Sequence, residues 1–437
     1  MSDTELAIPI LRGAEVTPER LRTRFGAKNE AAEHAVAEIL ADVYARGDDA
    51  VLEYTRRFDG VEISSLAVDP SEIESAASQV AAENPGLLDT MTRAAENIRR
   101  FHERQVRQGF SVHDERGGIV SGQRVIPLDR VGLYIPGGTA VYPSTLLMNA
   151  IPAKLAGVKE LILASPPQKD GRCAPTILAA AKVAGVDRIF RMGGAQAVAA
   201  LAYGTVSVPR VDKITGPGNV YVQTAKRQLY GLVDIEMIAG PSEILIIADE
   251  SANARFAAAD LLSQAEHDAM AAAILLTTSA PFAEAVRAEL ARQLVSLPRR
   301  EIARRSIEEN GRIAVIASLS EAAEISNAIA PEHLELCVKD PFALLGAILH
   351  AGSVFLGHYA PEALGDYFAG PNHTLPTNGA ARFSSPLSVD DFVKKSSFLY
   401  YTKDALRADA EHVARFARAE QLEAHARSAE IRLADDR

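Results

Sequence analysis

VDKITGPGNVYVQTAKRQLY, the stretch at residues 211–230, decides the fold class of this chain. Val211–Thr215 has the apolar, β-branched content of a strand, GPGN at Gly216–Asn219 forms a glycine-rich turn, and Val220–Tyr230 follows as a helix. Two similar strand–helix pairs precede it: Leu161–Ser165 with Thr176–Ala184, and Arg188–Met192 with Ala195–Tyr203. Repeated βα units predict a parallel, doubly wound sheet, in which nucleotides bind where strands pass into helices.

A second βα series begins at Glu243. Its predicted strands are Glu243–Asp249, Ala272–Thr278, Gly311–Ala317, Glu335–Val338 and Gly352–Leu356, and its predicted helices are Ala254–Asp268 and Ser320–Ala330. We therefore predict an α/β protein with two Rossmann-like doubly wound domains, at residues 123–236 and 237–380. The first opens with two β-type runs, QRVIPL and RVGLYI, and with a glycine-rich turn at Pro136–Thr145.

Helical segments flank the two predicted domains. Residues 1–23 read as an extended arm with a short helical patch, and residues 24–122 as a helical region that packs with the second α/β domain. In that region, Ser71 followed by Glu74 has the form of a capping box. Residues 381–437 are expected to form a small helical tail domain.

Composition narrows the function classes. The 437 residues carry a net charge of −11, which argues against a nucleic-acid or anionic membrane partner. The presence of only two cysteines argues against a disulfide framework, and two sulfurs cannot build a thiolate-only metal site. The N-terminus does not have the pattern of a secretory signal, and no apolar run reaches the roughly 20 residues of a membrane span. We expect a cytoplasmic enzyme.

The motif QAEH places Gln264 and His267 at i and i+3, on one face of the predicted helix. Imidazole is a good zinc ligand and an amide oxygen an uncommon one, so a divalent metal could bind if other segments add ligands. Taken alone, the same pair also fits satisfied polar residues.

The motif APEHLE places Glu332 beside His333, just after Pro331. Proline suits a first helical turn, so we expect the pair on a helix, pointing about 100° apart. Histidine is the natural base for an alcohol and glutamate for a water. The alternative is a surface Glu–His pair.

Two further motifs lie near the end of the chain. GDYFAGPNHTLP at Gly365–Pro376 reads as a long loop in which Asp366 is a plausible metal ligand, and in which Asp366 and His373 could otherwise cap turns. EQLEAHA puts Glu420 and His425 on the last helix, where a histidine is usually solvated. The glycine turns match neither G-x-G-x-x-G nor a Walker A motif, so they leave the oxidant undecided.

Taken jointly, the motifs are specific. VGLYIPGG, YPSTLLMNAIPAKLAGV, GGAQAVAALAYGT, DKITGPGN, AGPSE, SQAEHD, EHLE, GDYFAGPNHTLPT and a terminal E-x-L-x-A-H closely resemble the histidinol dehydrogenase family, in order from about Arg130 to His425. The terminal motif has Gln421 where the family usually has glycine. The resemblance implies a zinc-dependent enzyme that oxidises L-histidinol through L-histidinal to L-histidine with two NAD, the last step of histidine biosynthesis.

The resemblance also implies roles for individual residues. Those implied as zinc ligands, for one Zn²⁺ per subunit, are Gln264, His267, Asp366 and His425. Glu332 and His333 are implied as the catalytic pair, with His333 taking the alcohol proton and Glu332 activating water. Those implied as NAD contacts are Tyr134, Gln196 and Asn219. Those implied as substrate contacts are Ser242, Gln264, His267, His333, Asp366, His373, Glu420 and His425. The family forms homodimers whose tail domain reaches the partner, so His425 and Glu420 are expected to complete the partner's site.

Three other functions compete with this interpretation. A related zinc- and NAD-dependent dehydrogenase of another small polar alcohol would differ around Glu420 and His425. A metal hydrolase using Glu332 to activate water would have no use for the three glycine turns. A non-enzymatic nucleotide-binding module would not need the four metal ligands.

Overall fold

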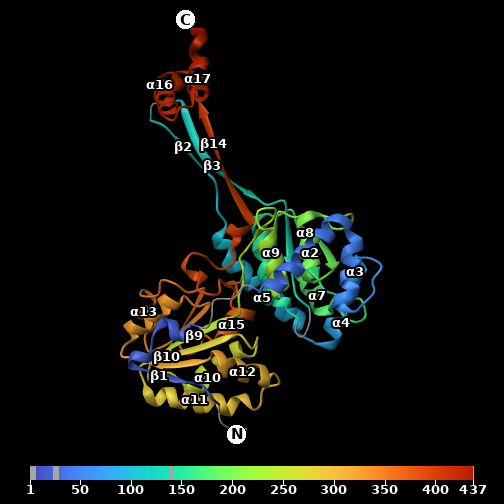
Figure 1. Ribbon diagram of the computed structural model, residues 1–437, viewed down its shortest axis with the longest axis vertical. Helices are drawn as coiled ribbons and strands as arrows, with labels where there is room; N and C mark the ends of the chain where they lie inside the picture. Colours follow the sequence, from blue (N-terminus) through green and yellow to red (C-terminus); the bar gives the residue numbers. More distant parts are fainter. Residues whose placement is uncertain (1–5, 23–28, 116, 138–140, 437) are drawn as a thin grey trace. The chain divides into compact units, whose positions relative to one another are not determined.

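The computed structural model describes residues 6–22, 29–115, 117–137 and 141–436. These residues belong to two compact units (Figure 1). Unit 1 comprises Met1–Gln105 and Leu128–Phe392, and unit 2 comprises Val106–Pro127 and Val393–Arg437. Part of the glycine-rich turn predicted at Pro136–Thr145, residues 138–140, lies outside the described residues.

Unit 1 contains two parallel sheets, the first ordered β6-β5-β4-β7-β8. Its strands are β4 (Arg130–Tyr134), β5 (Glu160–Ser165), β6 (Arg188–Arg191), β7 (Lys213–Thr215) and β8 (Asp234–Ile235). The connecting helices are α6 (Pro143–Ala156), α7 (Pro175–Ala184), α8 (Gly194–Tyr203) and α9 (Val220–Leu229). The strand order reverses between β4 and β7, which is where sheets of this type bind ligands, at the carboxyl edge.

The N-terminal helices α2 (Glu30–Arg46), α3 (Asp48–Asp59), α4 (Pro70–Glu83) and α5 (Leu87–His102) cover this first sheet. α2 packs on α8 and α9, α3 on α8, α4 on α7, and α5 on α6. The prediction that residues 24–122 pack with the second α/β domain is therefore wrong. The physical reason is that α8 is apolar on every side, with Ala195–Ala202 all buried, so it needs a second layer of helices over it.

The second sheet has the order β1-β11-β10-β9-β12-β13, also parallel throughout. Its strands are β1 (Ile10–Arg12), β9 (Glu243–Ala248), β10 (Ala272–Thr277), β11 (Arg312–Val315), β12 (His333–Cys337) and β13 (Ser353–Leu356). Its helices are α1 (Pro18–Leu21), α10 (Ala254–Ala265), α11 (Ala280–Leu294), α12 (Arg300–Asn310), α13 (Leu319–Ile329), α14 (Pro341–Leu345) and α15 (Glu362–Tyr367). The prediction of a mixed α/β chain with parallel sheets is confirmed.

Alternate residues of each strand face opposite layers of the fold, as a doubly covered sheet requires. On β9, Ile244 and Ile246 belong to the core shared with α10, α11 and α12, while Leu245 and Ile247 belong to the core shared with α13. All four side chains are fully buried. The near-continuous apolar run EILIIA is thus a central strand covered on both faces.

Unit 2 combines a strand ribbon with helices from the end of the chain. β14 (Val393–Tyr401) pairs antiparallel with β3 (Ile119–Pro127), which pairs antiparallel with β2 (Phe110–His113). The helices are α16 (Lys403–Ala419) and α17 (Glu423–Glu430). The domain boundaries predicted at residues 123 and 381 are therefore wrong. β3 is one strand that pairs with β14 along its whole length, so QRVIP belongs with the tail and not with the first sheet.

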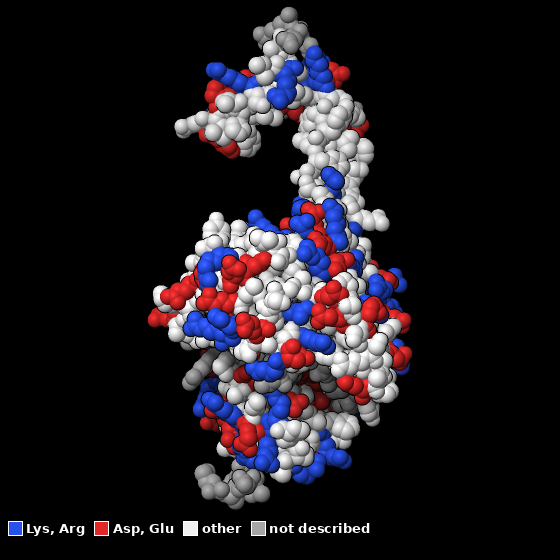
Figure 2. Space-filling model, turned by 90° about the vertical axis from the view of Figure 1, so that its right-hand side faces the viewer, with Lys and Arg blue, Asp and Glu red and all other residues white. Residues whose placement is uncertain are grey.

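Two local features complete the fold. The capping box at the start of α4 uses Asp69 and Glu72, where Glu72 accepts the Asp69 N–H at 3.2 Å. The predicted pair Ser71 and Glu74 is wrong because Pro70 occupies the first helical position, which makes the residue before it the cap. Among the described residues, no helix combines the length and apolarity that a membrane crossing requires. Acidic and basic side chains are interspersed over the face of unit 1 in Figure 2.

Candidate active site

The candidate catalytic residues lie at the amino edge of the second sheet. Glu243 begins β9, and His333 begins the neighbouring strand β12, opposite Ile244. The helical position expected for Glu332 and His333 is wrong. α13 ends at Ile329, and Ala330, in the left-handed conformation with φ 55°, turns the chain into β12.

His333 is buried and has one ring nitrogen available. Its Nδ1 lies 3.1 Å from the backbone oxygen of Glu243, so it donates there. Its Nε2 has no hydrogen-bond partner among the described residues and lies 3.8 Å from Oδ1 of Asp366. Nε2 is therefore the ring nitrogen that gains or loses a proton. Burial lowers the pKa of His333, but the carboxyl groups of Glu362, Glu332 and Asp366 outweigh it and raise the pKa to about 10.

Glu332 is held against the same strand pair. Its carboxylate accepts the Glu243 N–H at 2.9 Å and lies 3.6 Å from Nδ1 of His333. Burial raises the pKa of Glu332 to about 7, against the opposing effect of His333. A carboxyl group with a pKa near neutrality is suited to accepting a proton from water.

Gln264 and His267 lie at the end of α10, near this pair. Gln264 is in the last turn, whereas His267 follows the helix in a turn in which its N–H donates to the Gln264 carbonyl at 3.2 Å. The predicted helix therefore extends three residues too far. With its amide nitrogen toward α15, Gln264 donates to the Glu362 carboxylate at 3.0 Å and accepts the Glu243 N–H at 3.1 Å.

Asp366 lies in the short helix α15, where the sequence predicted a loop. This helix places Asp366 and Glu362 one turn apart on the same face. His267, Glu362 and Asp366 each offer a ligand atom, and these atoms all lie within 4.8 Å of one another. Glu362 was not among the predicted site residues, although the i, i+4 spacing of Glu362 and Asp366 in PEALGDY could have indicated it.

The donor set fits a divalent cation. Four carboxyl groups are gathered here, those of Glu243, Glu332, Glu362 and Asp366. Burial raises the pKa of Glu362 to about 8. Buried carboxylates are costly unless they are paired or coordinate a metal, and the imidazole and carboxylate groups present are zinc ligands.

A second layer of acidic residues supports α15. Glu335 on β12 is buried, and its Oε1 accepts the N–H of Glu362 at 2.8 Å, at the start of the helix. Burial and the neighbouring Asp260 carboxyl hold the pKa of Glu335 well above its usual range. Glu335 thereby orients the helix that carries two of the candidate ligands.

The predicted NAD contacts gather at the carboxyl edge of the first sheet. Tyr134 ends β4, and its hydroxyl accepts the Gly194 N–H at 3.0 Å. Gln196, on the first turn of α8, is buried, and its Oε1 has no partner among the described residues. Asn219 caps α9 by accepting the N–H groups of Tyr221 and Val222, the second and third residues of the helix.

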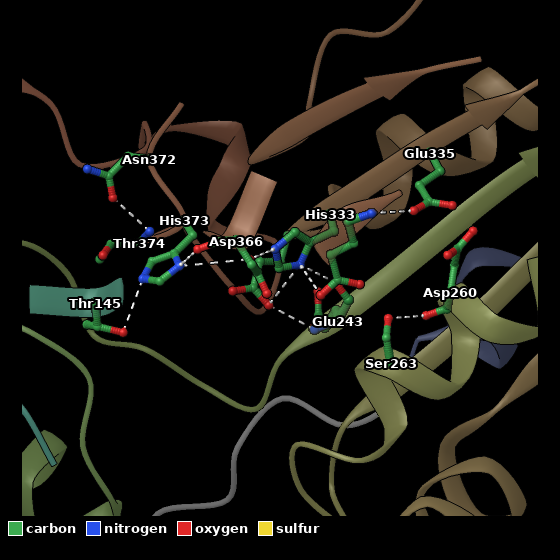
Figure 3. Close-up of polar contacts among 12 residues, drawn as sticks. Thr145, Glu243, Asp260, Ser263, His333, Glu335, Asp366, Asn372, His373 and Thr374 are labelled. Carbon is green, nitrogen blue, oxygen red and sulfur yellow. Dashed lines mark hydrogen bonds and ion pairs between the residues drawn. The ribbon is translucent and has the colours of Figure 1, made fainter. Parts of the chain in front are cut away.

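His373 joins the two edges. Its Nδ1 lies 2.8 Å from the backbone oxygen of Asp366, and its Nε2 lies 3.1 Å from Oγ1 of Thr145 on α6 (Figure 3). Figure 3 shows Thr145, His373, Asp366 and His333 in that order across the site. A cavity of about 220 Å³ is lined by His333, Asp366 and His373, among others. The carboxyl edge of the first sheet thus faces the amino edge of the second sheet, with these polar side chains between them.

The remaining predicted site residues lie in other segments. Ser242 directly precedes β9, and the N–H of its near neighbour Gly240 donates to Thr377 at 2.6 Å. Glu420 and His425 are exposed residues of unit 2. Gln421, between them, takes a left-handed φ of 63°, the conformation that a glycine there would adopt readily.

Known proteins of one family match this chain over nearly its whole length. A family model described as histidinol dehydrogenase matches residues 22–433. The histidinol dehydrogenase of Bacillus cereus is 54% identical over 417 residues, 95% of this chain and 96% of that protein. The histidinol dehydrogenase of Syntrophotalea carbinolica is 56% identical over 408 residues, 93% of this chain and 94% of that protein. The crystal structure of histidinol dehydrogenase from Elizabethkingia anophelis matches with a TM-score of 0.92 and 38% identity over 98% of each chain. The chain therefore belongs to the histidinol dehydrogenase family and is an NAD-dependent dehydrogenase of histidine biosynthesis.

Proposed function

We propose that this enzyme binds zinc and oxidises L-histidinol through L-histidinal to L-histidine, with reduction of two NAD. The observation that carries the proposal is the placement of His333, with a free Nε2, between the Glu332 carboxyl group and the ligand cluster of His267, Glu362 and Asp366. A base, a water-activating carboxyl group and a cation-binding set are the three parts that this oxidation needs.

Three proposed zinc ligands come from one subunit, namely Gln264, His267 and Asp366. The proposed fourth ligand is His425 of the partner subunit. Bound zinc would hold nitrogen atoms of histidinol and so orient the alcohol carbon. With the amide nitrogen of Gln264 toward Glu362, the amide oxygen accepts the Glu243 N–H and is directed away from α15, which carries Asp366. Zinc ligation by Gln264 therefore requires the amide to turn its oxygen toward α15, which a bound cation would favour.

The two oxidations divide between Glu332 and His333. His333 Nε2 takes the alcohol proton in the first step, while its Nδ1 remains bonded to the Glu243 carbonyl. Glu332 then removes a proton from the attacking water while His333 gives its proton to the carbonyl oxygen, which forms the aldehyde hydrate. His333, now neutral again, accepts the hydrate's hydroxyl proton in the second step. Bound NAD would supply the hydride acceptor for both oxidations. Burial of both groups excludes bulk water, which protects a bound aldehyde.

The first sheet is the proposed NAD domain, with Tyr134, Gln196 and Asn219 as contacts. Its support is the Rossmann strand order and the position of all three residues at the carboxyl edge near the strand reversal. The proposed substrate contacts include Ser242 of the same subunit and Glu420 of the partner subunit. His373 can contact the substrate only if it releases Thr145 or Asp366, because both its ring nitrogens are engaged.

A homodimer with shared sites is part of the proposal. Unit 2 exposes large apolar side chains on its strands and helices, namely Phe110, Val112, Phe398, Leu399, Tyr400, Tyr401, Val413 and Phe416. Exposed apolar surface of this extent is typical of a protein interface. The same unit carries Glu420 and His425, so pairing through unit 2 would bring these residues to a partner's site.

One experiment tests the activity and another the shared site. Purified enzyme with zinc, NAD and L-histidinol should release two NADH per histidine; turnover of another alcohol instead would contradict the substrate assignment. For the shared site, inactive His267→Asn and His425→Asn proteins are mixed, unfolded together and refolded. A mixed dimer should recover one active site because one of its two sites receives both native ligands. Recovery of no activity would indicate that both ligands come from one subunit.

A further inference from the structure

A buried ion pair lies directly behind the GPGN turn. Lys226 on α9 is fully buried, and its Nζ lies 2.7 Å from Oε1 of Glu236, whose side chain is 2% exposed. Lys226 also donates to the Gly216 carbonyl at 3.0 Å, and Glu236 accepts the Gly216 N–H at 2.8 Å. Both backbone polar groups of Gly216 are therefore held by this one pair.

Other contacts also restrain the GPGN turn. Gly216 has φ 119°, and a Cβ there would overlap the carbonyl oxygen of Tyr134. At the other end of the turn, Asn219 caps α9. The turn is thus fixed at Gly216 by the ion pair and at Asn219 by the cap, with Pro217 and Gly218 between them.

Stability alone does not explain the pair. A buried ion pair is often no more stabilising than a well-packed apolar pair of the same volume, because both charges lose their hydration. Here the two charged groups also form two hydrogen bonds to one backbone position at the strand reversal, where ligands of such sheets bind. An apolar pair would fill the space but would leave the Gly216 N–H and carbonyl without these partners.

The segment after Glu236 is held by hydrogen bonds that do not involve the ion pair. The Ala239 N–H donates to Oε1 of Gln223 at 3.2 Å, and the Gly240 N–H donates to Thr377. These bonds hold the approach to Ser242 independently of Lys226. Loss of the ion pair should therefore affect the turn and not the substrate contact.

We propose that Lys226 and Glu236 are positioning residues that preform the GPGN turn for NAD. The inference rests on the proposed placement of NAD at this turn. The pair contacts the backbone of Gly216 and acts on the cofactor only through that backbone.

The test compares two buried lysines of the same domain. Lys226→Met removes the hydrogen bond to the turn, whereas Lys213→Met removes a buried lysine paired with Asp234 at 2.8 Å that does not contact the turn. Lys226→Met should raise KM for NAD about tenfold, the lower end of the effect seen when a group that orients a metal ligand is lost. KM for L-histidinol, zinc content and kcat at saturating NAD should stay within about twofold of the native values. Lys213→Met should leave KM for NAD unchanged.

Equal values of KM for NAD in the two lysine variants would overturn the proposal, as would a fall in kcat at saturating NAD in Lys226→Met. Should Lys226→Met not fold, Glu236→Gln takes its place, because its amide oxygen can still accept the Gly216 N–H; the proposal then requires a smaller rise in KM for NAD and fails without one. A third variant, Asn219→Asp, distinguishes failure of the positioning role from failure of the proposed NAD placement. It keeps the helix cap and adds a negative charge that repels the pyrophosphate of NAD. If Asn219→Asp raises KM for NAD and Lys226→Met does not, only the positioning role is wrong. If neither variant changes it, the proposed NAD placement is wrong as well.

Discussion

A methyl group added at Gly216 would collide with the backbone at the end of β4. Its Cβ would overlap the Tyr134 carbonyl oxygen and would lie 2.9 Å from the carbonyl carbon of that residue. Carbon atoms in contact are about 3.5 Å apart or more, so the turn would have to move by about 0.6 Å at least. The left-handed φ of 119° adds a conformational cost for any residue with a Cβ.

Gly216→Ala should therefore destabilise the first domain by two separable contributions. The backbone conformation costs about 1–2 kcal/mol, and the overlap costs about 1–3 kcal/mol more. Gly231→Ala is the matched control because Gly231 has φ 102° and no heavy atom within 4 Å of an added Cβ. Only the conformational contribution should appear in that variant.

The assay is thermal unfolding together with KM for NAD. A difference of about 1–3 kcal/mol between the variants corresponds to a Tm lower by about 2–4 °C per kcal/mol in a domain of this size. Movement of the turn should also raise KM for NAD in Gly216→Ala and not in Gly231→Ala. Equal Tm and equal KM for NAD in the two variants would refute the argument that the turn is packed against Tyr134.

Three further predictions concern the metal, the chemistry and pH. His267→Asn should lose most bound zinc after dialysis, measured by atomic emission, with the same dimer mass as the native protein; a native zinc content would contradict the ligand assignment. Glu332→Gln should still oxidise L-histidinol to the aldehyde but should convert L-histidinal at a rate lower by at least about 100-fold, measured as NADH from each substrate, and an unchanged rate would exclude Glu332 as the water-activating group. Burial raises the pKa of Asp59 to about 6 from its ordinary value of 3.8, against the opposing effect of Lys169, so the folded state binds the proton more tightly than the unfolded state. The charge at Asp59 therefore reduces stability above about pH 6 and ceases to do so below about pH 4, so Asp59→Asn should raise the unfolding free energy by about 1 kcal/mol at pH 8 and not at pH 4. A constant gain across this pH range would contradict the burial effect.

The candidate site was only partly visible in the sequence. The spacing of Gln264 and His267, and the adjacency of Glu332 and His333, could be read directly. The secondary structure at these residues could not be read from the sequence. His333 lies on a strand, His267 follows its helix, and Asp366 lies in a helix. Local patterns around glycine and proline are ambiguous in this respect, because a left-handed residue such as Ala330 is decided by the packing of its neighbours.

The sequence by itself determined the two βα series, their parallel sheets and the motifs that assign the family, because hydrophobic period and turn residues are local properties of the chain. Only the tertiary structure decided which segments meet. β3 pairs with β14 across more than 250 residues, the N-terminal helices cover the first sheet, and Glu362 joins His267 and Asp366. Such contacts depend on which apolar faces remain uncovered after each sheet has formed, and no local pattern records that. The GPGN turn shows both contributions. Its residues predicted a turn after a strand, but only the fold brings together the buried Lys226–Glu236 pair behind it.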